Sequence, residues 1–139
     1  MEPLEKAKSL LPGNSCALVR EESCIVSRER GIFPILNLIK EGFSLQGFSI
    51  ADKVIGRSAA FLFIKAKVKE VYGETMSVGA DELLNKHGIP HSYGTLAEKI
   101  INRNGDGLCP MEESVEGIND VDEAYIAINR KVKSLQKSK

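Results

Sequence analysis

The residues best suited to chemistry are Asp52, Lys53 and Arg57 in the first half of the chain and Cys109 in the second. Lys53 and Arg57 would lie one turn apart on a helix predicted for residues 49–67. Cations near a helix N-terminus oppose the macrodipole, so they suit a nearby anion. We predict a phosphate- or carboxylate-bearing small molecule, held by these cations and by free backbone N–H groups. A solvated basic stripe is the alternative.

Asp52 has a structural explanation as well. Ser49 and Asp52 have the spacing of a capping box, with Ser49 as the N-cap and Asp52 at the third helical position. Capping is compatible with ligand binding beside Ser49, because helix N-termini also bind anions. A glycine within a helix costs about 1 kcal/mol relative to alanine. Close approach by a ligand or another backbone would explain why Gly56 occurs there.

Cys109 directly precedes Pro110, and proline at a first helical position would place this thiol at a helix N-terminus. That position favours the thiolate, so Cys109 is a candidate nucleophile. The preceding turn-rich loop could orient a ligand through Asn102 and Asp106. A turn followed by a capping thiol is the alternative, and the sequence places no histidine as a base.

His87 and His91 have a spacing that metal sites use, but Gly88 and Pro90 separate them. These two residues prevent a shared helical face, so we predict a surface turn and no metal or other cofactor.

The overall composition narrows the class of protein. The chain has 139 residues, the size of one domain, and its 19 basic and 19 acidic side chains cancel. No net positive field attracts nucleic acid, and no apolar run is long enough to span a membrane. The N-terminus lacks a signal-peptide pattern, and three cysteines suit a reducing compartment. We expect a cytoplasmic protein without nucleic-acid or membrane partners, and a homodimer is compatible with the sequence.

The N-terminal third predicts a helix, a hairpin and a second helix. Residues 2–11 favour a short helix, and residues 16–19 and 24–27 favour two strands. A two-residue loop at Glu21 and Glu22 would pair residues whose numbers sum to 43. Cys16 and Cys24 would then face opposite sides as small core residues, and they could not form a disulfide. Residues 32–41 predict a helix and residues 43–48 a connector or short edge strand.

The remaining chain alternates between helices and strands. The segment 49–67 is apolar on most sides, which predicts a buried helix. Strands are predicted at 68–76 and 89–93, and helices at 81–87, 96–101, 111–116 and, capped by Asn119, about 120–136. These elements predict a single α/β domain over residues 1–139, with a core at about 14–118. Its expected form is a three-layer α/β/α sandwich with a mixed sheet.

Two stretches also carry a resemblance to known proteins. The segment 49–60, and the motifs ADKVIGR at 51–57 and INRNGDGLCPME at 101–112, are similar to an uncharacterised bacterial and archaeal family. That family is placed in the cytidine-deaminase-like superfamily, and the likeness covers about residues 16–118. The resemblance implies a cytidine-deaminase-like fold without a known activity.

The deaminase chemistry itself is not implied. Zinc deaminases use His or Cys, any residue and Glu, followed downstream by Pro-Cys-x-x-Cys. In this sequence the first ligand falls at Ile50 and the acid at Asp52, and no cysteine occurs at 77–80. Cys109 lies too far along the chain, and Glu112 stands where a second thiol would be. We therefore predict that the protein is not a zinc-dependent deaminase.

Three functions remain open. The first is a metal-free domain that binds a small anionic, nucleotide-like molecule through Ser49, Arg57, Asn102, Asp106 and Glu112. The second is an enzyme with Cys109 as nucleophile and Asp52 or Lys53 in proton transfer. The third is a non-catalytic interaction subunit whose former active site is filled by packing.

Overall fold

The first two strands form the predicted hairpin. The computed structural model describes residues 2–29, 31–102, 104–105 and 107–137. β1 (Cys16–Arg20) and β2 (Ser23–Ser27) are antiparallel. Arg20 pairs with Ser23 and Cys16 with Ser27, so the predicted register is confirmed. Cys16 is buried and Cys24 is exposed. The two cysteines therefore face opposite sides, but placing Cys24 in the core was wrong.

The hairpin joins three parallel strands in one mixed sheet. β3 (Ser49–Ile55), β4 (Glu70–Ser77) and β5 (His91–Ala97) follow it, and the order is β2-β1-β3-β4-β5. β1 is antiparallel to both of its neighbours, whereas β3, β4 and β5 are mutually parallel. The α/β class with a mixed sheet is confirmed.

The predicted helix over 49–67 is wrong in its first half. Residues 49–55 form β3, and helix α3 (Arg57–Ala66) begins only after Gly56. β3 lies in the middle of the sheet, where a strand is buried on both faces and is apolar without clean alternation. Such a run cannot be distinguished from a buried helix by its pattern. Ser49 and Asp52 are therefore strand residues, and the capping box does not form.

The chain after residue 90 also differs from the prediction. The helix expected at 96–101 does not form, because β5 continues through Leu96 to Ala97. Thr95 and Glu98 have capping-box spacing, but Thr95 pairs with Thr75 of β4. Pairing with the sheet overrides this local signal.

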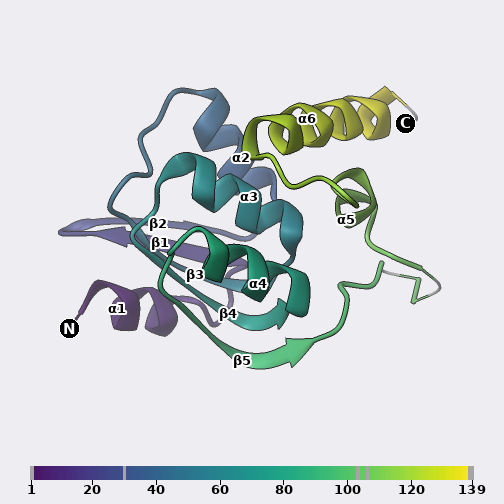
Figure 1. Ribbon diagram of the computed structural model, residues 1–139. Helices are drawn as coiled ribbons and strands as arrows, with labels where there is room; N and C mark the ends of the chain where they lie inside the picture. Colours follow the sequence, from purple (N-terminus) through teal and green to yellow (C-terminus); the bar gives the residue numbers. More distant parts are fainter. Residues whose placement is uncertain (1, 30, 103, 106, 138–139) are drawn as a thin grey trace.

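Helices cover the two faces of the sheet unequally (Figure 1). On one face α1 (Pro3–Leu10) packs with Ala17, Val19 and Ala51. On the other lie α2 (Phe33–Lys40), α3, α4 (Val78–Lys86), α5 (Pro110–Ser114) and α6 (Val121–Lys137). Asp120 caps α6 in place of Asn119, because its carboxylate accepts from the Glu123 N–H at 2.9 Å.

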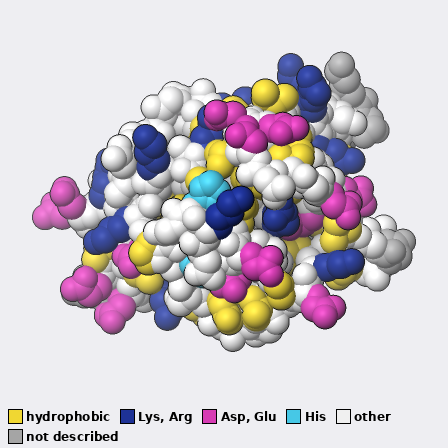
Figure 2. Space-filling model, in the orientation of Figure 1, with side chains coloured by type: hydrophobic (Ala, Val, Ile, Leu, Met, Phe, Trp, Pro, Cys, Tyr) yellow, Lys and Arg dark blue, Asp and Glu magenta, His cyan; other side chains and the backbone are white. Residues whose placement is uncertain are grey.

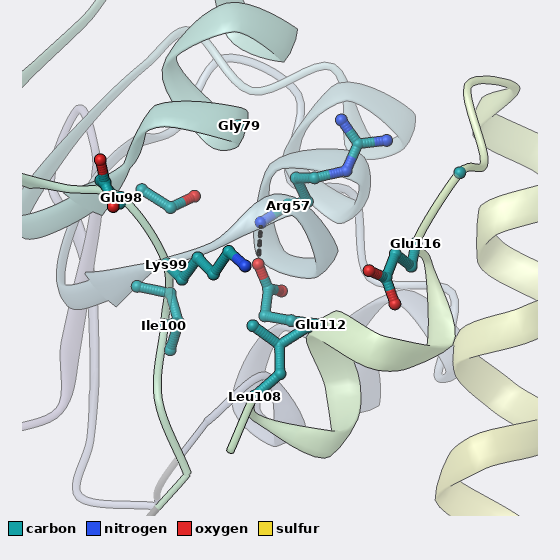
Figure 3. A pocket seen from close by; sticks show the side chains of 10 residues that line it. Arg57, Gly79, Glu98, Lys99, Ile100, Leu108, Glu112 and Glu116 are labelled. Atoms are coloured by element: carbon teal, nitrogen blue, oxygen red, sulfur yellow. Dashed lines mark hydrogen bonds between the residues drawn. The ribbon is translucent and has the colours of Figure 1, made fainter. Parts of the chain in front are cut away.

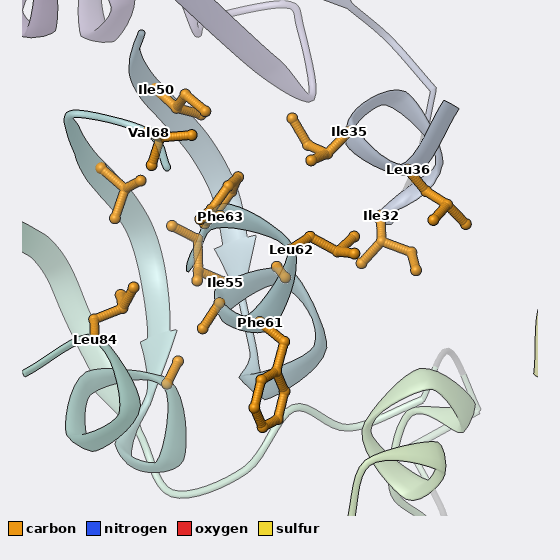
Figure 4. Close-up of a cluster of buried hydrophobic side chains, with 14 of the residues drawn as sticks. Ile32, Ile35, Leu36, Ile50, Ile55, Phe61, Leu62, Phe63, Val68 and Leu84 are labelled. Carbon is orange, nitrogen blue, oxygen red and sulfur yellow. The ribbon is translucent and has the colours of Figure 1, made fainter. Parts of the chain in front are cut away.

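The main core lies between the sheet and α3 (Figure 4). Ile50 and Ile55 of β3 point toward Leu62 and Phe63 of α3, and all four are buried. This packing holds α3 against the sheet, with its first turn at the carboxyl end of β3. Among the described residues, none of the helices has the length and the apolar composition of a membrane-spanning segment.

Candidate functional site

Two helices begin at the same edge of the sheet. β3 leads through Gly56 into α3, and β4 leads directly into α4. Because β3 and β4 are parallel, both helix N-termini lie at the carboxyl ends of the strands, where open α/β sheets bind ligands. Each N-terminus carries N–H groups without intrahelical acceptors and a partial positive charge.

The carboxylate of Glu112 occupies the N-terminus of α3. Its Oε1 accepts from the Arg57 N–H at 2.7 Å, and its Oε2 accepts from the Ser58 N–H at 3.0 Å and the Ser58 hydroxyl at 2.8 Å. Glu112 is only 8% exposed. Three donors and the helix dipole thus compensate the loss of water around this charge.

Gly56 makes this contact sterically feasible. A Cβ at position 56 would lie 2.4 Å from Glu112 Oε1 and 2.5 Å from its Cδ. The φ of −102° is one that any residue adopts, so the glycine is needed for space and not for conformation. The close approach expected at Gly56 is real, but the approaching group is a carboxylate of the same chain.

The side chain of Arg57 is also held in place. Its Nη2 donates to the Ile118 carbonyl, and its guanidinium carbon lies 5.3 Å from the Phe61 ring centre. A Cβ at Gly79 would lie 2.9 Å from the Arg57 Cγ and Cδ. Arg57 therefore crosses the start of α4 and secures the segment that links α5 to α6.

A pocket of about 230 Å³ lies between these elements (Figure 3). We call it the α3–α4 pocket. Its lining comprises Arg57, Ser77, Gly79, Glu98, Lys99, Ile100, Leu108, Glu112, Glu116 and Gly117. At the start of α4, Ser77 Oγ accepts from the Ala80 N–H at 3.0 Å. The two helix N-termini thus contribute to one pocket.

Lys99 is the second cation of this pocket, besides Arg57. It follows β5, and in Figure 3 its side chain extends into the pocket. Within 4.0 Å, the pairs of acidic and basic side chains in the described part of the chain are Lys65–Asp122 and Asp81–His91, so Lys99 has no ion-pair partner there. An acidic group of a ligand could reach this ammonium without displacing an existing ion pair.

The structure brings together only some of the residues expected in one site. Arg57 and Glu112 share the α3–α4 pocket. Asn102 and Cys109 line a separate, mainly apolar cavity of about 550 Å³. Cys109 is the N-cap residue of α5, as predicted, and is partly buried. Asp106 lies outside the described residues.

The three β3 residues lie apart from both cavities. Ser49 is at the amino end of β3, where its hydroxyl donates to Glu70 at 2.6 Å. Lys53 is exposed on β3, not one helical turn from Arg57. Neither Lys53 nor Asp52 lines the α3–α4 pocket or the cavity at Cys109. The described geometry therefore shows no shared cleft for Asp52 and Cys109.

Asp52 is a buried carboxyl of a different kind. It pairs with Cys16 across the β1–β3 ladder and is 8% exposed. Its Oδ1 accepts a long bond of 3.4 Å from the Val54 N–H. Burial raises the pKa of this carboxyl from 3.8 to about 7, and backbone donors oppose the shift only in part. Burial, together with the nearby Asp52, raises the pKa of the Cys16 thiol to about 12, which makes it a poor nucleophile.

Sequence reasoning missed several residues that shape the site. Lys99 was missed because its role depends on where β5 ends, and Ser58 because α3 was expected to begin eight residues earlier.

His91 was assigned to a surface turn, but it starts β5. Its Nε2 lies 2.6 Å from Asp81 Oδ1, and its Nδ1 lies 2.8 Å from the Ile89 carbonyl. No group of three metal-ligating side chains occurs among the described residues.

Comparisons with known proteins identify the family. Residues 7–132 match the profile of TM1506, described as a domain of unknown function (DUF1893), and the chain belongs to this family. It is similar to the crystal structure of a DUF1893 family protein (TM1506) from Thermotoga maritima, with a TM-score of 0.85 and 25% identity. The match covers 93% of this chain and 89% of the other. None of the curated proteins compared matches this chain.

Proposed function

We propose that this protein binds a small anionic, nucleotide-like metabolite in the α3–α4 pocket. The observation that carries the proposal is a pocket beside the start of α4 that also holds Lys99, a cation without an ion-pair partner among the described residues. The start of α3 is already occupied by the Glu112 carboxylate. Helix N-termini favour phosphate and carboxylate groups, and an ammonium adds a point charge.

The other charged residues refine the ligand class. The Glu112 carboxylate already has three donors, and the Arg57 guanidinium already has an acceptor. Glu98 and Glu116 are exposed at the rim, where they can accept hydrogen bonds. A nucleotide has both required features, an anionic group for Lys99 and amino or ring N–H donors for the glutamates. The volume of about 230 Å³ is below the usual range for pockets that enclose drug-sized ligands, so only part of a nucleotide would lie inside the pocket.

We also infer that the fold is cytidine-deaminase-like and that binding proceeds without zinc. The strand order β2-β1-β3-β4-β5, with one antiparallel hairpin, supports the resemblance of residues 49–60. A zinc deaminase needs His or Cys ligands in both of its motifs. Here α3 begins with Gly56, Arg57 and Ser58, and residues 77–80 at α4 include neither His nor Cys. The acid assigned to Asp52 lies in β3 and not at a helix start.

A reducing compartment such as the cytoplasm suits three free cysteines.

Native mass spectrometry of the protein purified from cells, with metabolite profiling of the released ligand, tests the proposal. Ile100→Trp should abolish the bound small molecule, because Ile100 lines the pocket and indole fills it. Ile126→Trp is the matched control, since Ile126 is 53% exposed on α6. Loss of the small molecule in both variants, or its retention in both, would refute the assignment to this pocket.

A further inference from the structure

The outermost parallel strand has an unusual environment. β5 is the edge strand beyond β4, and all five residues from Ser92 to Leu96 are exposed. Tyr93 and Leu96 are 40% and 41% exposed. Parallel strands are normally covered on both faces, whereas antiparallel hairpins such as β1–β2 tolerate water on one side. The exposure of β5 is therefore harder to explain than that of β2 at the opposite edge.

This edge also lacks the usual protection against pairing. Between residues 92 and 97 there is no Lys, Arg, Asp, Glu or Pro. Exposed edge strands normally carry charges, proline or bulges that prevent another strand from adding to them. Figure 1 places β5 along the lower rim of the molecule, and Figure 2 shows hydrophobic side chains at the surface of that rim. The edge has the features of a strand-pairing surface.

We propose that β5 pairs antiparallel with β5 of a second copy of this chain, forming a two-fold dimer with one continuous ten-strand sheet. A two-fold axis requires identical strands to pair antiparallel. If the axis passes at Gly94, paired residue numbers sum to 188. Tyr93 then lies opposite Thr95 of the partner subunit, an aromatic and β-branched pair of the kind that stabilises antiparallel strands.

The other pairs in this register are equally well matched in size. Leu96 lies opposite Ser92 of the partner subunit, and the two Gly94 residues face each other at the axis. On both sides of the axis a larger side chain thus meets a smaller one. This steric self-complementarity is the reason to assign a second copy, and not a foreign peptide, to the edge.

Charge supports the same partner. β5 carries no charged side chain between residues 92 and 97, so pairing of two copies brings no like charges together along the strand. The 19 basic and 19 acidic residues also leave no net repulsion between copies. The proposal does not depend on ligand binding in the α3–α4 pocket.

Light scattering coupled to size exclusion, over an about hundredfold range of protein concentration, tests the dimer. The expected result is a dimer for the wild-type chain. Thr95→Lys should raise the dimer dissociation constant at least about tenfold, because it places a charge at the edge near its symmetry mate. Val26→Lys on β2 is the matched control, since Val26 is 48% exposed on the other edge strand, and it should leave the dimer intact.

Ser92→Lys provides a second disruption of the same edge if Thr95→Lys unfolds the chain, and circular dichroism checks folding of each variant. Hydrogen exchange adds a local measurement, in which amides of residues 92–96 should become protected as the protein concentration rises. A chain that is monomeric at every concentration would overturn the proposal. So would a dimer that Val26→Lys dissociates and the β5 variants do not.

Discussion

Two buried carboxyl groups in this domain have opposite environments. Glu112 and Asp52 are each 8% exposed. Glu112 faces the N-terminus of α3 and accepts three hydrogen bonds of 3.0 Å or less, whereas the Asp52 carboxylate accepts one long bond from Val54. The pKa of Asp52 rises to about 7 as a consequence of burial. Hydrogen-bond donors and helix dipoles, and not burial alone, therefore set how well the fold accommodates a buried carboxyl group.

Removing the hydrogen-bonded carboxylate of Glu112 should have the largest effect on stability. Glu112→Ala leaves the Arg57 and Ser58 donors without their acceptor and should lower the free energy of unfolding by about 4 kcal/mol at pH 7. Urea denaturation measures the change. Glu113→Ala, at an exposed neighbour on α5, should change stability by less than about 0.5 kcal/mol. Equal effects of the two variants would contradict the role of Glu112.

Replacing Asp52 should raise the stability of the protein, and the size of this gain should depend on pH. Its pKa is about 7 in the folded protein and 3.8 ordinarily, so the folded state binds the proton more tightly. The stability from this group is fully present below pH 3.8 and is lost as pH rises through about 7. Asp52→Asn should therefore be more stable than wild type by about 3 kcal/mol at pH 8.

The same comparison at pH 4 provides the control. There the wild-type carboxyl is protonated when folded, and the two proteins should differ by less than about 1 kcal/mol. Urea denaturation at both pH values measures this. An advantage of Asp52→Asn that is independent of pH would show that Asp52 does not titrate as described.

A smaller effect is expected from crowding the Glu112 carboxylate. Gly56→Ala introduces a Cβ 2.4 Å from Glu112 Oε1, so the carboxylate must move and its hydrogen bonds to α3 weaken. A loss of about 1–2 kcal/mol in the free energy of unfolding is expected. Combining Gly56→Ala with Glu112→Ala should then cost less than the sum of the single changes. Additive losses would mean that the two residues do not interact.

Local signals in the sequence predicted part of this fold. The hairpin register follows from the two-residue loop at Glu21 and Glu22 and the two-residue period of strands, so it was predicted correctly. The start of α5 follows from Pro110. β3 was mistaken for helix because its neighbours in the sheet, which bury both faces, are separate in the sequence.

The site was less predictable for the same reason. Arg57 and Glu112 were both selected, but their contact joins residues 55 positions apart and depends on the docking of α5. Lys99 belongs to no motif, and only the length of β5 brings it to the pocket. Asp52 was selected for acid chemistry, and its raised pKa results from tertiary burial that no local pattern encodes.

We propose above that the α3–α4 pocket binds a small anionic ligand through Lys99. Calorimetric titration of cytidine and adenosine monophosphates into wild type, Lys99→Ala and Lys86→Ala tests it most directly. Lys86 is an exposed lysine at the end of α4 that does not line the pocket. Lys99→Ala should weaken binding by about tenfold or more, and Lys86→Ala should leave it unchanged. Equal affinities of all three proteins, or no binding by wild type of either nucleotide, would contradict the account.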